Sequence, residues 1–228
     1  VVLAMGLTVA AYLGWSLFLA AQELRKTRSM TEAAGVILPA ALVRFAAYES
    51  AMMRLALISW GAEPHVPDGA RAFAYHRVIN PLVATFLVLQ AIEIVVVDLL
   101  VSHWSETAAL VLLALGIWGV LFFIAMMKAF RLYPVLLHED ELQVRGGSFV
   151  DFSLPLSAIA SVRSSISDAE TRRADVLNAA LLSHPNVVLR LSRPLEYSPL
   201  FGRPRMVERV AFRLDEPAPF LAALQRRI

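Results

Sequence analysis

The sequence predicts an α+β membrane protein, in which a transmembrane helical bundle precedes a small antiparallel β domain with a C-terminal helix. Hydrophobic residues make up 58% of the 228-residue chain, and the mean hydropathy of +0.61 is far from that of a soluble domain. Long apolar runs continue to residue 127 and then give way to short alternating runs. We therefore expect a transmembrane domain over 1–131 and a β domain over 132–228.

The first predicted span covers residues 1–22, which carry no charge. This run exceeds the ~7–15 residue apolar core of a secretory signal peptide and lacks a basic segment ahead of it. Gly6, Ala10 and Gly14 recur at the four-residue spacing that lets transmembrane helices approach closely. We expect this face to contact a partner helix or to form a homo-oligomer. The sequence opens on Val1, so we also expect a preceding segment in a longer protein.

The segment 36–59 is apolar and long enough to span, but it carries Arg44, Glu49 and Arg54. Charges at the bilayer centre are costly, and a crossing here would also separate the basic groups on either side. We therefore favour a helix that lies at the interface or folds back into the bundle, with a fourth crossing as the alternative. Trp60-Gly61 and the prolines after them should end this helix.

Two further spans are predicted over 81–101 and 107–127. Asn80-Pro81 has the composition of a helix N-cap followed by proline in the first turn. Only residues 102–106 connect the two spans, so they should form an antiparallel hairpin. Trp104 in this turn fits the aromatic enrichment found at membrane interfaces.

The distribution of positive charge predicts the orientation. Basic groups follow the first span (Arg25, Lys26, Arg28), precede the second (Arg71, Arg77) and follow the third (Lys128, Arg131), whereas the 103–106 turn has none. With three spans, all of these groups lie on one side of the membrane. The positive-inside rule makes that side the cytoplasm, so we expect a multi-pass inner (plasma) membrane protein with a cytoplasmic C-terminal domain.

After Tyr133-Pro134 the pattern predicts strands. Two short alternating runs, 141–145 and 148–154, flank Gly146-Gly147, which is a hairpin signal. A second pair covers 186–192 and 208–214, with apolar residues at every second position. Glu216-Pro217 should introduce a last helix over 218–227.

The two strand sets, the "LPLSAIASV" stretch between them and the closing "DEPAPFLAALQRRI" resemble bacterial PH-like modules appended to membrane spans. With "FAYHRVINPLVATFLVLQAIEIVVVDLL" ahead of it, the whole chain is similar to uncharacterised bacterial integral membrane proteins with a C-terminal PH-like domain. That family resemblance implies no settled activity. The chain departs from the pattern at 167–185, where we expect a polar, helical insert between the strand sets or a different β-sandwich topology.

Glu93 and Asp98 are the candidate polar residues within a span. A carboxylate near the bilayer centre costs about 2.5–3.5 kcal/mol on insertion scales, so it usually faces a bundle interior. Five residues separate the two, about 140° around a helix, so we do not expect both to face one ligand. Glu93 could form a structural hydrogen bond, pair with Arg44 or Arg54, or bind a cation; Glu49 is a weaker candidate for such a pairing.

The arginines of the β domain form local groups that could contact anionic headgroups or a protein partner beside the membrane. The candidates are Arg172, Arg173, Arg190, Arg193, Arg203, Arg205 and Arg209. A solvated surface is the alternative, because eleven acidic residues are interleaved over 128–228. The net charge there is +3, fourteen basic residues minus eleven acidic ones, which is too modest to predict nucleic-acid binding.

Catalytic chemistry has little support in the sequence. Cysteine is absent, and the five histidines show no metal-ligand spacing. No phosphate-binding loop, dinucleotide fingerprint or serine nucleophile motif occurs, so we predict no catalytic residue, metal or cofactor. The sequence favours a non-enzymatic interaction or scaffold protein. The alternative is a small transporter or intramembrane enzyme in which Glu93 and Asp98 bind an ion, a proton or a polar substrate.

Overall fold

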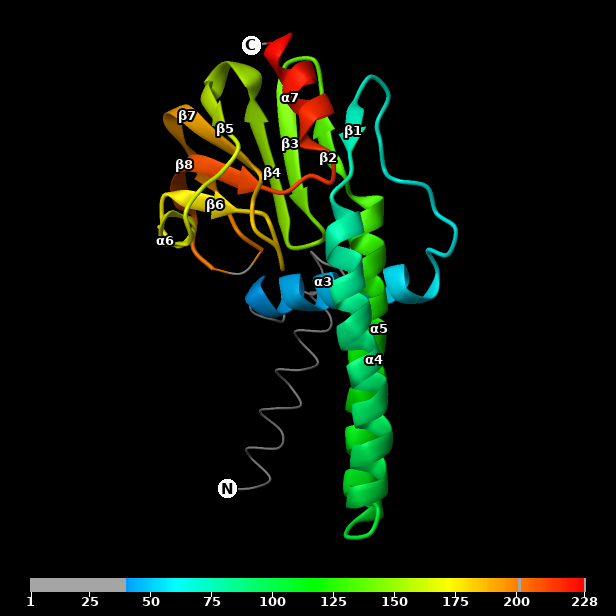
Figure 1. Cartoon of the computed structure of the whole chain (residues 1–228). Coiled ribbons are helices and arrows are strands. Elements are labelled where there is room, and N and C mark those ends of the chain that lie inside the picture. The colour runs from blue at the N-terminus through cyan, green and yellow to red at the C-terminus, as the bar shows by residue number, and fades with distance from the viewer. Residues whose placement is uncertain (1–39, 201, 228) are drawn as a thin grey trace, which may run out of the picture. The chain divides into compact units, whose positions relative to one another are not determined.

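The computed structural model describes residues 40–200 and 202–227, with side chains from residue 45 onward (Figure 1). The chain divides into two compact units, Val1–Ala51 and Met52–Ile228. The span predicted over 1–22, including Gly6, Ala10 and Gly14, lies outside the described residues. Within them, the fold is α+β, as predicted, with two long helices and two sheets.

Helices α4 (His76–Val101) and α5 (Glu106–Leu132) form the predicted hairpin. They run side by side in Figure 1. A Cβ atom added at Gly116 of α5 would lie 2.5 Å from the side chain of Ile94 in α4, and one added at Gly119 would lie 3.3 Å from Gln90. These glycines let the two backbones approach closely, as small residues do between transmembrane helices. Ser105 caps α5 by accepting a hydrogen bond from the Ala108 amide.

The start of α4 differs from the prediction. The helix begins at His76, and Pro81 lies inside it rather than in its first turn. Proline is tolerated there because the backbone carbonyl that loses its partner belongs to Arg77, at the exposed beginning of the helix. Asn80 is not a cap, because its side-chain amide donates across the hairpin to the Met127 carbonyl at 3.4 Å.

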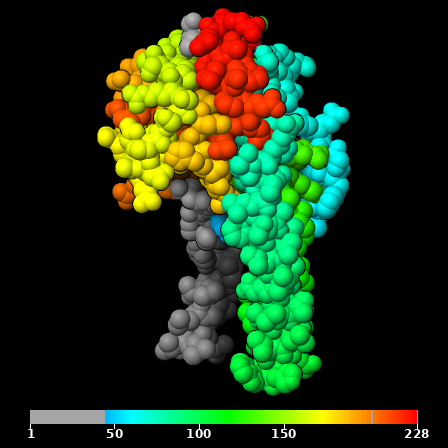
Figure 2. Space-filling view, in the orientation of Figure 1, coloured from blue at the N-terminus to red at the C-terminus, as the bar shows by residue number. Residues whose placement is uncertain are grey.

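Both hairpin helices are long and apolar enough to cross a membrane. Only 6% of the most apolar window of α4 and 17% of that of α5 are buried, whereas the core helix of a soluble protein is mostly buried. Figure 2 shows the side chains of α4 uncovered on the face turned to the viewer. The exposed side chains are large and apolar, which a hydrocarbon solvent favours and water does not.

Helix α3 (Ala40–Leu57) forms within the segment predicted to lie at the interface or fold back. Its C-terminal end is held by α5. The Lys128 ammonium donates to the carbonyls of Leu55 and Ala56 at 2.9 and 2.8 Å, and the same nitrogen lies 3.5 Å from the centre of the Trp60 ring. A cation at the carboxyl end of a helix satisfies free carbonyls and complements the helix dipole.

The strands form two four-stranded sheets. Sheet A has the order β1-β2-β3-β4 and is antiparallel throughout. Sheet B has the order β5-β7-β8-β6, in which only the β6–β8 pairing is parallel. The strands of sheet A are Arg71–Phe73, Val135–Leu137, Glu141–Gly146 and Val150–Pro155. In chain order, those of sheet B are β5 (Ile159–Arg163), β6 (Val176–Asn178), β7 (Val187–Tyr197) and β8 (Arg205–Phe212).

Aromatic side chains join the two sheets to the C-terminal helix α7 (Pro217–Gln225). The Phe220 ring lies edge-on to Phe73 of sheet A, with centroids 5.1 Å apart, and to Phe212 of sheet B at 5.6 Å. Phe220 is fully buried, so α7 closes one end of the core between the sheets. The outer side of α7 forms part of the surface (Figure 2).

Two features of the β domain depart from the sequence prediction. The stretch 167–185 is not a helical insert. It holds one turn of helix, α6 (Asp168–Thr171), and then strand β6, which extends sheet B. A separate short 3-10 helix, Leu156–Ala158, lies before this stretch, between β4 and β5. Sheet A also takes β1 from the chain ahead of α4, so the sheet is not confined to residues after 131.

Tyr75 connects the start of α4 to the end of α5 and to sheet A. Its hydroxyl donates to the Tyr133 carbonyl at 3.1 Å and accepts from the Gly147 amide at 2.6 Å. Burial raises the pKa of Tyr75 far above its usual value, so the hydroxyl stays protonated and able to donate. Gly147 has φ +57°, and an added Cβ would lie 2.8 Å from the Phe130 ring.

Candidate anion-binding pocket

The outer face of sheet B carries opposed arginines. On β7, Val187, Leu189 and Leu191 are buried and Arg190 between them is exposed, as alternation along a strand requires. Arg190 lies directly opposite Arg209 of β8. Like charges directly opposite each other destabilise an antiparallel pair, so this arrangement needs compensating negative charge.

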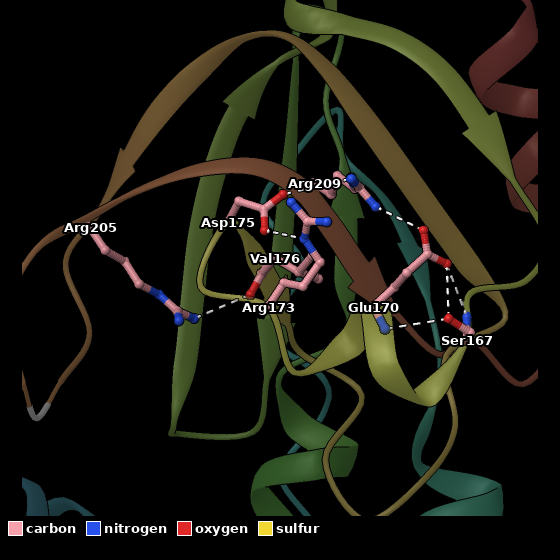
Figure 3. Close-up of polar contacts among 7 residues, drawn as sticks. All are labelled: Ser167, Glu170, Arg173, Asp175, Val176, Arg205 and Arg209. Carbon is pink, nitrogen blue, oxygen red and sulfur yellow. Dashed lines mark hydrogen bonds and ion pairs between the residues drawn. The ribbon is translucent and has the colours of Figure 1, made fainter.

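Arg209 has that compensation. Figure 3 shows it between two carboxylates, with Nη1 3.1 Å from Oε1 of Glu170 and Nη2 3.7 Å from Oδ2 of Asp175. Arg173 Nε donates to the other oxygen of Asp175 at 2.9 Å. The Arg209 guanidinium is therefore fixed in place, and its side chain retains 24% exposure.

Hydrogen bonds hold both carboxylates in the charged form. Glu170 accepts from the Ser167 backbone and side chain in a capping box at the start of α6, and these bonds, followed by the nearby Arg209, lower the pKa of Glu170. The hydrogen bond from Arg173 lowers the pKa of Asp175 in the same way. The network therefore keeps its two negative charges at neutral pH.

In the part of the chain that the structure describes, Arg190 has no such partner. Among the described residues, no ion pair involves Arg163, Arg190 or Arg193. All three side chains are exposed. Together with Arg209 they line one pocket of about 440 Å³, whose lining holds four arginines and two glutamates and so carries a formal charge of +2. We call this the arginine pocket. Its full lining is Arg163, Ser165, Ile166, Glu170, Val188, Arg190, Leu191, Ser192, Arg193, Pro194, Glu208 and Arg209.

Local backbone structure shapes this pocket. The pairing of β7 with β8 is regular up to Arg190 and resumes at Leu195, so the residues between them form a bulge that carries Arg193 out of the ladder. At the other side, Ile166 and Val188 belong to a small buried cluster that also includes Val176 and Ala211. This cluster fixes the segment that leads to α6 against the outer face of the sheet.

The structure brings together some of the arginines that the sequence singled out. Arg190, Arg193 and Arg209 line the pocket. Arg172, Arg173, Arg203 and Arg205 do not line it. Arg173 serves the Asp175 ion pair, and Arg205 donates to the Val176 carbonyl at 3.4 Å (Figure 3). Arg172 and Arg203 are exposed.

The sequence prediction missed Arg163. This residue ends β5, opposite Val188 of β7, and lines the pocket. In sheet B, β7 lies between β5 and β8. The run "SAIASVR", which ends in Arg163, does not alternate cleanly between buried and exposed residues. Residues 160 and 161 are both exposed, at a shift in the register between β5 and β7. Arg163 could have been identified only by predicting that residues 159–163 form a strand that pairs with β7.

The hairpin holds a second polar site. Glu93 and Asp98 both line a groove of about 180 Å³ between α4 and α5, with Gln90 and Gly116. The expectation that the two carboxyls do not both face one ligand stays a prediction. Glu93 is exposed and Asp98 is half-buried.

Pairing with Arg54, one of the alternatives left open for Glu93 and Glu49, is not seen among the described side chains. Neither Glu93 nor Glu49 forms an ion pair with Arg54, which is exposed. The side chain of Arg44 lies outside the described ones. Glu49 is half-buried, and its Oε2 atom has no hydrogen-bond partner in the described part of the chain. Over those same residues, no group of three or more His, Asp or Glu side chains is arranged to hold a metal ion.

Comparison with known proteins yields no match to a family model, to a curated protein or to a solved structure. The expected membership of a bacterial membrane family with a PH-like domain therefore remains a prediction.

Proposed function

We propose that this protein is a membrane-anchored docking module whose β domain binds an anionic group in the arginine pocket. One observation carries the proposal: three exposed arginines, none of them paired with a described carboxylate, converge on a pocket whose fourth arginine is already fixed by two carboxylates. An anion in the pocket would balance the charges of Arg163, Arg190 and Arg193, which form no ion pair among the described residues. Guanidinium groups suit such a ligand, because they bind phosphate and carboxylate oxygens in pairs.

The hairpin supplies the anchor in this proposal. The beginning of α4 and the end of α5 lie at the same end of the hairpin, and they carry Arg77, Lys128 and Arg131. The opposite end, residues 102–105, carries no basic residue. This asymmetry supports an orientation with the β domain in the cytoplasm of a multi-pass protein. Helix α3 would then lie at the cytoplasmic interface, where Lys128 holds its end.

The ligand would be an anionic headgroup or an acidic group of a protein partner, and pyrophosphate is a suitable probe for either. The test is calorimetric titration of pyrophosphate into the full chain in detergent. Arg163→Gln/Arg190→Gln removes two pocket charges. The matched control, Arg172→Gln/Arg203→Gln, removes two exposed arginines outside the pocket.

We expect the pocket double variant to weaken binding by roughly tenfold or more, since a charge-assisted hydrogen bond contributes about 1.5–3 kcal/mol. The control should stay close to the unmodified protein. Equal weakening in both double variants would mean that only the overall charge attracts the anion, and the docking proposal would fail.

A second candidate function rests on the groove that brings Glu93 and Asp98 together with Gln90. In this alternative the protein moves or acts on a cation, a proton or a polar molecule within the membrane. Labelling of Glu93 by a hydrophobic carbodiimide in nanodiscs tests it, with Glu93→Gln as the control. Labelling that varies with pH and is suppressed by a cation would favour this function, and an inert Glu93 would count against it.

A further inference from the structure

The turn between β3 and β4 packs along the last part of α5. The Phe149 ring lies 6.4 Å from the Phe122 ring, edge to face, and the Gly147 backbone lies against the Phe130 ring. Both contact residues of α5 are aromatic, and they are eight positions apart in the sequence. Since a helix rises about 1.5 Å per residue, the turn follows about 12 Å of α5.

This contact brings the β domain close to the apolar part of the helix. Phe122 precedes Met127, the last residue of the uncharged run, by five positions, which corresponds to about 7.5 Å along the axis. If α5 spans the bilayer, as in the proposed function, the β3–β4 turn lies at the depth of the headgroups. The inference below rests on that placement.

A second turn lies beside the first. A Cβ atom added at Gly146 would be 3.2 Å from the Ala179 carbonyl oxygen. From Ala179 the chain makes a compact turn closed by its own hydrogen bonds: the Leu181 amide donates to the Ala179 carbonyl at 3.0 Å, and the Ser183 hydroxyl donates to the Leu181 carbonyl at 3.3 Å. We call residues 179–183 the leucine turn.

Leu182, in this turn, is unusual in two independent ways. Its φ of +54° is the left-handed conformation that favours glycine or asparagine, and no other non-glycine residue in the described part of the chain has a positive φ. Its side chain is also 49% exposed. Beyond residue 132, the described residues contain only one other exposed large hydrophobic side chain, Met206.

Neither backbone conformation nor packing within the chain favours leucine at this position. A strained residue persists where the surroundings or a function require it. We propose that Leu182 contacts lipid, and that the leucine turn, beside the β3–β4 turn, rests the β domain on the bilayer interface. An apolar side chain at the boundary of headgroups and acyl chains gains free energy by leaving water, which would offset the backbone strain.

The experiment exploits the absence of cysteine from the sequence. Leu182→Cys is labelled with the environment-sensitive fluorophore NBD, and the full chain is placed in phosphatidylcholine nanodiscs with or without lipids that carry a doxyl quencher. Glu141→Cys is the matched control, because Glu141 is exposed at the opposite end of β3 from Gly146. Leu110→Cys is the reference for the span, since Leu110 is 62% exposed on α5.

We expect doxyl lipids to reduce NBD fluorescence at positions 182 and 110 by roughly twofold or more, as for a group within the acyl boundary, and to leave position 141 unchanged. Quenching at 110 without quenching at 182 would overturn the lipid contact and leave the membrane anchor standing. Absence of quenching at 110 would overturn the anchor itself. A blue-shifted but unquenched label at 182 would mean that protein covers the turn, which also overturns the proposal.

A second measurement needs no substitution and guards against misfolding of the labelled variant. The unmodified chain is irradiated in nanodiscs that contain a diazirine-bearing phosphatidylcholine, and the adducts are located by mass spectrometry. We expect adducts within 179–183 and none within 139–141. The absence of adducts in 179–183, with adducts present on α5, would contradict the proposal.

Discussion

Removal of the Tyr75 hydroxyl should destabilise the β domain strongly, although the change deletes one atom. The hydroxyl is the acceptor for the buried Gly147 amide at 2.6 Å and the donor to the Tyr133 carbonyl at 3.1 Å. Tyr75 is 3% exposed, so no water can replace it without rearrangement. The buried Gly147 amide left unsatisfied costs about 1–3 kcal/mol, and loss of the bond to the part-buried Tyr133 carbonyl costs about 1 kcal/mol more, which gives about 2–4 kcal/mol for Tyr75→Phe.

The assay is thermal unfolding of the full chain in detergent, followed by circular dichroism. For a protein of this size the estimated loss corresponds to a fall in Tm of about 5–12 °C. Tyr133→Phe is the matched control, since the described structure gives its hydroxyl no hydrogen bond. A Tm for Tyr75→Phe equal to that of Tyr133→Phe would refute the reasoning, because it would show that the two hydrogen bonds of the Tyr75 hydroxyl do not stabilise the protein.

Further predictions concern residues in the turns and connections next to the two sheets. Gly147→Ala should destabilise the protein by about 2 kcal/mol or more, from the left-handed backbone and the close aromatic ring beneath it, and the same thermal assay measures this. Asn186→Ala should cost about 2 kcal/mol in urea unfolding, because the Asn186 amide both donates to and accepts from the Leu214 backbone, at 2.8 and 2.9 Å. The lowered pKa of Glu170 means that its stabilisation is present above the ordinary pKa and is lost as the pH falls through the lowered one. Acid unfolding monitored by fluorescence should therefore depend less steeply on pH in Ser167→Ala than in the unmodified protein.

Elements with strong local signals could be predicted from the sequence. The long apolar runs on either side of residues 102–106 become α4 and α5, and Gly146-Gly147 joins two strands. Most of the predicted strands 186–192 and 208–214 lies in β7 and β8, and Leu214 follows the end of β8. In each case the residues that define the element also supply its buried face, so local pattern and tertiary packing agree.

Elements formed by long-range pairing could not be predicted in the same way. β1 and β6 have three residues each, too few to show a period, and both exist because a neighbouring strand offers an edge. The helix start at His76 was missed because Pro81 fits inside the second turn, where its missing amide costs little.

For the candidate site, the sequence could predict that arginines would form it, but not which arginines would come together. The sequence drew attention to Arg190, Arg193 and Arg209, but they converge through the register of β7 with β8 and the bulge beside it. Arg163 reaches the pocket because β5 pairs with β7. Glu170, in α6, forms an ion pair with Arg209. None of these relations is local in sequence, so charge runs alone could not separate pocket arginines from exposed ones.

The measurement that tests the docking proposal most directly is protection of arginines from phenylglyoxal, read residue by residue by mass spectrometry on the full chain. Pocket residues Arg163 and Arg190 and the exposed residues Arg172 and Arg203 should all react in the free protein. We predict that pyrophosphate slows modification of the first pair and leaves the second pair unaffected. Equal protection of both pairs, or protection of neither, would contradict an anion site in the arginine pocket.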